Sequence, residues 1–181
     1  MRKITVITGS PRKHGNSTML AEAFIEAAKE NGIEVARFDA CTMNIVGCRA
    51  CRACYKNGHA CAFEHDFDAV ADSILASDTV VFTMPVYWFS IPAQIKSIID
   101  HFYAFMVGGK KEQVKGKHCI VLTTMGQANG LGVEEGVTIG MKRSADFLGW
   151  TYEEHTFGKM NIPGAIANTD AISLVQALAK R

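Results

Sequence analysis

The sequence is short of net charge and of long apolar runs. Its 181 residues include 19 Lys and Arg against 18 Asp and Glu, a formal net charge of +1, so it lacks the basic excess typical of nucleic-acid binding. No apolar stretch approaches the ~20 residues that a membrane-crossing helix needs. The basic start, MRKITVITGS, has an apolar run too short for a signal peptide and is interpreted as a first strand. We therefore expect a cytoplasmic protein without structural disulfides, with no nucleic-acid and no membrane partner.

The hydrophobic pattern alternates between strand-like and helix-like segments. Compact β-branched runs, separated by apolar residues at helical spacing, are typical of strands joined by crossover helices. This order predicts an α/β fold, a doubly wound five-stranded parallel sheet with helices on both faces. We expect one domain, residues 1–181, with a cysteine-rich insertion at about 41–64. Strands are expected at 4–8, 35–38, 79–83, 119–123 and 151–156, and helices at about 20–28, 67–75, 95–106, 137–148 and 171–179.

Sheets of this kind bind ligands at the carboxyl ends of their strands, and the first loop there, GSPRKHGNST at 9–18, is typical of an anion site. Its glycines permit tight turns, and the helix that follows presents free N–H groups and the positive end of its dipole. The loop has neither the lysine of a Walker A motif nor the G-x-G-x-x-G of a dinucleotide site. A structural alternative is that Asn16, Ser17 and Thr18 only cap the helix.

Two further loops follow the central strands. Tyr87, Trp88 and Phe89 are consecutive aromatics, which suit a planar ligand, a subunit contact or coverage of the sheet edge. The loop TTMGQANG at 123–130 has glycines that let backbone approach a flat ligand, or that form a plain surface turn. The loops taken singly leave these alternatives open.

Taken together, ITGSPRKHGNST, PVYWFSIPAQIKSIID and TTMGQ resemble the NADPH-dependent FMN reductase family. The resemblance covers most of the chain, to about Gly149, and implies a flavodoxin-like fold with bound FMN; the missing dinucleotide fingerprint argues against FAD. The matching residues are Ser10, Arg12, Gly15, Asn16, Ser17 and Thr18 at the phosphate loop, Pro85, Val86, Tyr87, Trp88 and Phe89 beside the flavin ring, and Thr124 and Gly126 in the third loop.

Four cysteines share one short stretch in the pattern C-x2-C-x2-C-x6-C. Within the family this pattern resembles the iron–sulfur flavoproteins, and thiolate-only ligation suits a [4Fe–4S] cluster near enough to FMN to exchange single electrons. Basic neighbours, Arg49, Arg52 and Lys56, are expected to favour ionised sulfur. Zinc ligation and a loop without metal remain alternatives. The expected metal ligands are Cys48, Cys51, Cys54 and Cys61.

The resemblance implies an FMN-dependent oxidoreductase that passes electrons from NAD(P)H through FMN to a quinone, flavin or protein acceptor. Hydride chemistry belongs to the cofactor, so no catalytic side chain is expected. Two alternatives are a non-enzymatic flavodoxin-like electron carrier and a zinc-stabilised binding module without flavin. Apolar side chains at 87–89 and at Phe102, Tyr103, Phe105 and Met106 also predict a homodimer or homotetramer, with the flavin near a subunit boundary.

Overall fold

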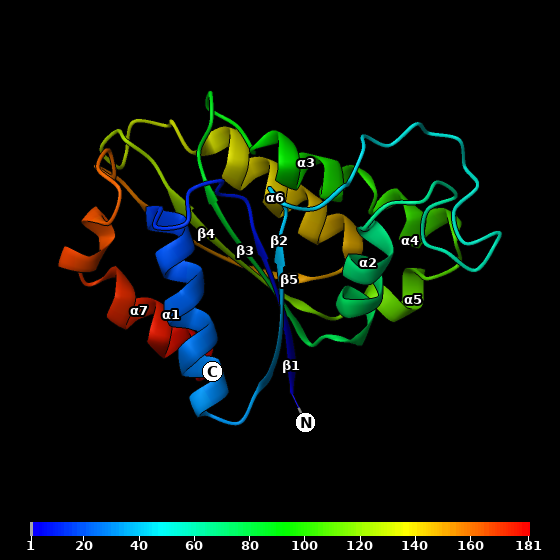
Figure 1. The fold of residues 1–181 in the computed structure, drawn as a ribbon, viewed down its shortest axis with the longest axis horizontal. Helices are drawn as coiled ribbons and strands as arrows, with labels where there is room; N and C mark the ends of the chain where they lie inside the picture. The colour runs from blue at the N-terminus through cyan, green and yellow to red at the C-terminus, as the bar shows by residue number, and fades with distance from the viewer. Residues whose placement is uncertain (1) are drawn as a thin grey trace.

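Five parallel strands form the centre of the computed structural model, which describes residues 2–181. The strand order is β2-β1-β3-β4-β5 (Figure 1), so the chain builds outward from β1 in both directions. Each expected strand lies inside an observed one, and the doubly wound five-stranded sheet is confirmed. The strands are β1 Lys3–Thr8, β2 Glu34–Asp39, β3 Thr79–Pro85, β4 His118–Thr124 and β5 Thr151–Phe157.

Helices cover both faces of the sheet. Helices α1 and α7 lie on one face, and α2, α3, α4 and α6 lie on the other (Figure 1). The side chains of Val6 and Leu122 belong to the core on the first face, and those of Ile7 and Val121 belong to the core on the second. The central strands are therefore apolar on both sides, as expected of a buried parallel sheet. The helices are α1 Asn16–Glu30, α2 Phe67–Ala76, α3 Ala93–Asp100, α4 Tyr103–Val107, α5 Lys111–Val114, α6 Glu135–Leu148 and α7 Ala171–Ala179, with a 3₁₀ helix, η1, at Ala165–Asn168.

The helix expected over 95–106 is two helices, because the chain breaks between α3 and α4 at His101 and Phe102. The break turns two rings into the core: Phe102 packs against Trp150, with ring centroids 5.9 Å apart, and Phe105 is fully buried. Trp150, 6% exposed, also donates its indole N–H to the carbonyl of Val114. The expectation that Phe102 and Phe105 add to an exposed apolar surface is therefore wrong.

The connection from β2 to α2 spans residues 40–66 and contains neither helix nor strand. It extends to one side of the sheet in Figure 1 and packs against the start of α4. The expected cysteine-rich insertion falls in this segment. Over residues 2–181, no helix combines the length and the apolar character needed to cross a membrane.

Candidate functional site

A groove of about 240 Å³ lies at the carboxyl ends of β1, β3 and β4, where the strand order reverses. Arg12 is the one charged residue that lines it within the described chain, so the groove favours an anion. Thr18 alone of the expected phosphate-loop residues is absent from the lining. The lining residues are Ser10, Arg12, Gly15, Asn16, Ser17, Pro85, Val86, Tyr87, Thr124, Met125, Gly126, Met160 and Asn161.

Helix α1 points its N-terminus at this groove without a side-chain cap. Its N-cap residue is Gly15, and no side chain at the cap position accepts a hydrogen bond from the first turn, so the N–H groups of that turn stay open to a ligand. A methyl group on Gly15 would lie 2.7 Å from the Ser10 hydroxyl oxygen and 3.2 Å from the Arg12 carbonyl. Glycine is thus required for the close turn, and the capping alternative finds no support.

The polar side chains of the loop divide between the groove and the scaffold. The Asn16 amide donates to the carbonyls of Met160 (3.1 Å) and Ile162 (3.0 Å), and its oxygen accepts the Ile166 N–H at 3.1 Å. Thr18 donates its hydroxyl to the Arg12 carbonyl at 2.9 Å. These two side chains hold the loop in place, which leaves Ser10, Arg12 and Ser17, with the backbone N–H groups, to face the groove.

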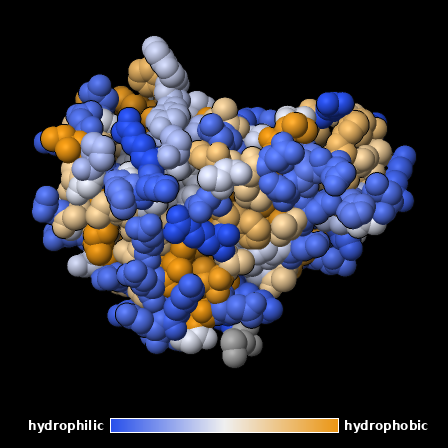
Figure 2. All heavy atoms as spheres, in the orientation of Figure 1, coloured by the Kyte–Doolittle hydropathy of each residue, from blue (hydrophilic) through white to orange (hydrophobic). Residues whose placement is uncertain are grey.

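Three consecutive aromatics form a tight hairpin beyond β3. Tyr87 and Ser90 exchange backbone hydrogen bonds of 3.1 and 3.0 Å, and Trp88 and Phe89 between them have φ of 47° and 61°. Two positive φ values in a two-residue turn define type I′, which favours Asn-Gly. The turn is the projection at the top of Figures 1 and 2, and Trp88 is 91% exposed at its tip.

This hairpin borders a second, more open hollow of about 520 Å³. Val86, Tyr87, Met125 and Gly126 line both this hollow and the groove, so the two are continuous. The backbone of the hairpin packs directly on α6 at Gly136. Any larger residue there would displace the hairpin, because a methyl group on Gly136 would overlap the Phe89 carbonyl. The N-terminus of α1, the groove and the aromatic hairpin therefore border one continuous surface.

Replacing Phe89 by glycine is expected to give a more stable protein than replacing it by alanine. Both changes remove the ring, but only glycine adopts a φ of 61° without the steric cost of about 1–2 kcal/mol that other residues meet there. Glycine also gains freedom in the unfolded chain, so we expect a net difference of about 1 kcal/mol in urea unfolding. Equal stabilities would show that the turn relaxes at no cost.

Thr124 and Gly126 of the third loop line the groove, and their contact with a flavin stays a prediction. A methyl group on Gly126 would overlap the Asn161 side chain, and Asn161 donates its amide to the Gly126 carbonyl at 3.0 Å. Met160 and Asn161 were missed by the sequence reasoning. They follow β5, whose carboxyl end reaches the same edge of the sheet, and that position was the available signal.

The four cysteines line one small cavity of about 20 Å³ under the 40–66 segment. The cavity shares no lining residue with the groove. Its loop is strained, because Ala50, Arg52 and Tyr55 all have positive φ, between 52° and 59°. Backbone held in this region by residues other than glycine is concentrated at functional sites. The cysteines are Cys48, Cys51, Cys54 and Cys61, the first two exposed and the others half-buried.

The thiols lie near one another. Burial is the main reason that the pKa of Cys54 is raised; a backbone hydrogen bond partly opposes it, and the neighbouring thiols Cys51, Cys48 and Cys61 add to it. The basic neighbours expected to favour ionised sulfur do not offset this: Arg49, for example, lies over the Phe63 ring at 4.6 Å from its centroid. A positive centre inside the cavity would lower that pKa.

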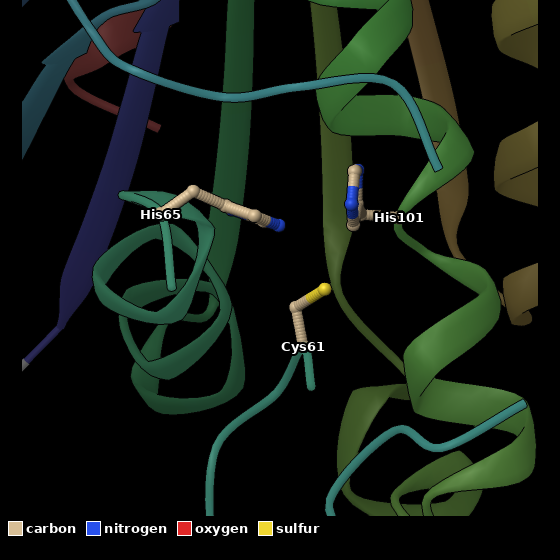
Figure 3. Close-up of side chains that lie close together, drawn as sticks. All are labelled: Cys61, His65 and His101. Atoms are coloured by element: carbon tan, nitrogen blue, oxygen red, sulfur yellow. The ribbon is translucent and has the colours of Figure 1, made fainter. Parts of the chain in front are cut away.

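Two histidines that the sequence reasoning did not assign to a site also line the cysteine cavity. Figure 3 shows Cys61, His65 and His101 pointing toward one another, and one ligand atom from each lies within 4.8 Å of the others. Burial, and then His101, lowers the pKa of His65. The spacing Cys61-x3-His65 was a signal in the sequence for one of these residues, whereas His101 is brought there only by the fold.

The strand order, the uncapped helix end at the strand reversal and the aromatic hairpin are those of a flavodoxin-like α/β protein with a groove suited to an anion. The family described as "Flavodoxin-like fold" matches residues 2–179, and the chain belongs to this family.

Several known proteins resemble the chain. It is 33% identical over 128 residues to an iron-sulfur flavoprotein of Methanosarcina thermophila, covering 71% of this chain and 65% of that protein. An FMN-dependent NADH:quinone oxidoreductase of Shewanella sp. strain ANA-3 is 32% identical over 112 residues, 59% of this chain and 57% of that protein. The matches thus span less than two thirds of these relatives. The structure of an FMN-dependent NADH-azoreductase of Bacillus anthracis in complex with FMN shares the fold, with a TM-score of 0.70, 18% identity and coverage of 100% and 99%.

Proposed function

We propose that this chain is an FMN-dependent oxidoreductase that passes electrons from NAD(P)H through FMN to a quinone, flavin or protein acceptor. One observation carries the proposal: the uncapped N-terminus of α1 and the aromatic hairpin stand at the two ends of one continuous surface. A phosphate at one end and a planar ring at the other describe a flavin mononucleotide. The relatives named for FMN and for quinone reduction support this choice.

The residues present fit FMN. The first-turn N–H groups of α1, the Ser17 hydroxyl and Arg12 would hold the phosphate, because a helix N-terminus with a cation suits a dianion. Backbone at Tyr87 and Gly126 would meet the ring. When bound, the flavin supplies the hydride and single-electron chemistry. The chain itself binds the cofactor, orients its ring against the hairpin and leaves one side open for the electron donor and acceptor.

The four cysteines would hold a [4Fe–4S] cluster, as a relative's name suggests. Within residues 2–181, no three of these thiols gather within 4.8 Å, whereas the sulfurs around one zinc ion are ~3.8 Å apart. Zinc would therefore need the thiols to move closer together, and it remains the alternative. The cavity of about 20 Å³ is close to the room that one water needs, so a cluster requires the exposed part of the loop, 48–51, to move outward.

The remaining proposals concern the context of the chain. Residues 1–181 form one FMN-binding domain carrying the cysteine-rich insertion, in a cytoplasmic protein whose six cysteines stay reduced. A homodimer or homotetramer would cover the exposed aromatics of the hairpin and Phe147 of α6, which is 73% exposed. The non-enzymatic carrier remains the alternative, since both functions need the same groove.

Steady-state oxidation of NADH and NADPH by anaerobically purified protein, with a quinone acceptor, tests the function. Bound FMN with quinone-dependent turnover is the expected result. Bound FMN without oxidation of either NADH or NADPH would contradict the enzyme and support the non-enzymatic electron carrier. Protein that neither contains nor binds flavin would contradict both.

A further inference from the structure

Cys61, His65 and His101 come from three different segments and meet on the wall of the cysteine cavity (Figure 3). Cys61 belongs to the 40–66 segment, His65 lies two residues before the start of α2, and His101 follows the last residue of α3. One ligand atom from each lies within 4.8 Å of the other two. Among the described residues, this trio and not the four thiols is the place where three metal-ligating groups converge.

His65 presents a buried nitrogen to the point where the three side chains meet. The residue is 9% exposed, and its Nε2 has no hydrogen-bond partner among residues 2–181. A buried polar atom left without a partner is costly, and histidine is the commonest metal ligand in proteins. Figure 3 shows the tip of this ring directed toward the other two side chains, so the nitrogen indicates a ligand between them.

His101 is already oriented as a metal-bound histidine would be. Its Nδ1 lies 2.8 Å from the Ser97 carbonyl, which only accepts, so Nδ1 carries the hydrogen and Nε2 presents a lone pair. Metal-bound histidines almost always donate their other ring N–H in this way, which fixes both the tautomer and the ring orientation. Because Ser97 belongs to the same helix, α3, this orientation is held before any metal binds.

His65 needs one rearrangement before it can bind a metal. Phe67 donates its N–H to His65 Nδ1 at 3.2 Å, so the metal-free neutral ring carries its hydrogen on Nε2. Binding at Nε2 moves that hydrogen to Nδ1 and frees the Phe67 N–H, which belongs to the first turn of α2, where helix N–H groups commonly turn to water. The carboxylates of Asp68 and Asp66 lie close enough to act on His65 electrostatically, and a carboxylate is a usual acceptor for the second N–H of a metal-bound histidine.

The space around the trio suits a single ion. The cysteine cavity has a volume of about 20 Å³, close to the room that one water needs. Ligand atoms around zinc are ~3.3–3.8 Å apart, so the three atoms would approach one another by at most about 1.5 Å. Cys61 and His65 also line an open hollow of about 260 Å³ together with Glu64 and Asp68, whose carboxylates attract cations. This hollow gives an ion a path to the trio without the loop movement that a cluster requires.

We propose that Cys61, His65 and His101 bind one divalent transition-metal ion of the zinc class, with water in the fourth position. One thiolate and two imidazoles form a ligand set that suits zinc. Binding releases the Cys61 proton to solvent and leaves both histidines neutral. The inference does not rest on bound FMN. It shares Cys61 with the proposed cluster, so one chain holds either the ion or the cluster.

Zinc binding by the full-length, reduced protein tests the site. Any iron is first removed with a chelator, and Zn²⁺ is then titrated anaerobically in competition with a chromophoric chelator. We expect one Zn²⁺ per chain in the wild type. Affinity should fall by at least about 100-fold in His101→Gln and in His65→Gln, since loss of a group that only supports a ligand already costs about 10- to 100-fold. Cys48→Ser, which changes the cavity but not the trio, and the remote His118→Gln should keep wild-type affinity.

An equal loss in Cys48→Ser would indicate a four-cysteine zinc site and overturn the inference, as would wild-type affinity in either variant of the trio. Nitrogen NMR of the wild type gives a second test that needs no variant. Addition of Zn²⁺ should shift Nε2 of His65 and of His101, and also the Phe67 amide, which loses its hydrogen bond; an unshifted His65 Nε2 would overturn the inference. Flavin content and quinone-dependent NADH oxidation, measured on the same samples, report separately on the proposed function.

Discussion

Cys54→Ala protein, prepared anaerobically, is expected to lose its iron and acid-labile sulfide while it retains FMN. Mutation of a residue that only hydrogen-bonds a metal ligand already lowers metal affinity by about 10- to 100-fold. Loss of a direct ligand should therefore remove most of the iron. Flavin is retained because the cysteine cavity and the groove share no lining residue. Elemental analysis, sulfide assay and the visible spectrum of the same sample measure all three quantities.

Cys41→Ala is the matched control for this experiment. Cys41 lies in the same segment but does not line the cavity, so iron, sulfide and flavin should stay at wild-type levels. Stoichiometric flavin with neither iron nor sulfide in the wild type, even after anaerobic reconstitution, would contradict the cluster. Zinc lost from the Cys54 variant would instead support the alternative ligation.

Ser17→Asp is expected to abolish FMN binding while the protein still folds. A carboxylate at this position would occupy the open N-terminus of α1, whose first turn holds no acidic residue, and would repel the phosphate. Loss of hydrogen bonds to a charged group, each about 1.5–3 kcal/mol, together with this repulsion, predicts a loss of affinity of at least about 100-fold. An acidic residue in the first turn of an exposed helix is favourable by about 0.3–1 kcal/mol, which offsets part of the cost of placing a carboxylate where Ser17 is only 2% exposed. The flavin-free variant should therefore still unfold cooperatively in urea.

Fluorescence titration with FMN and with riboflavin measures this effect, since riboflavin lacks the phosphate. Ser17→Ala is the control and should weaken FMN binding only by the loss of one hydroxyl. Asn16→Ala does not serve this purpose, because its amide fastens the 160–166 segment and its loss would unsettle the groove indirectly. FMN affinity unchanged in Ser17→Asp would place the phosphate elsewhere.

The sheet and its ligand-binding edge could be predicted from the sequence because they depend on local patterns. Alternation of apolar runs fixed the five strands, and glycines beside small polar residues marked the loops at their ends. The break between α3 and α4 could not be predicted, since the 95–106 segment keeps helical spacing throughout. It forms because Phe102 and Phe105 gain more by packing into the core than the helix loses by ending.

Long-range pairings account for the other omissions. The hydrogen bonds of the Asn16 amide join it to carbonyls that lie 144 and 146 positions further along the chain. His65 comes close to His101 only through the packing of α2, β3 and α3. The left-handed backbone conformation of Trp88 and Phe89 could not be predicted from local propensity either, because bulky aromatic residues normally avoid it. Such departures from local preference are expected where a protein binds its ligands.

The two tryptophans occupy opposite environments, so their fluorescence should report on different parts of the molecule. Trp150 is enclosed by the core, whereas Trp88 is almost fully exposed to water beside the hollow that continues the groove. Ultraviolet emission from the exposed indole should be red-shifted and open to collisional quenchers, and a bound isoalloxazine nearby should dim it by energy transfer. The buried indole should emit at shorter wavelength until the core unfolds. Occupancy of the groove and integrity of the core can therefore be read from one emission spectrum, without any attached dye.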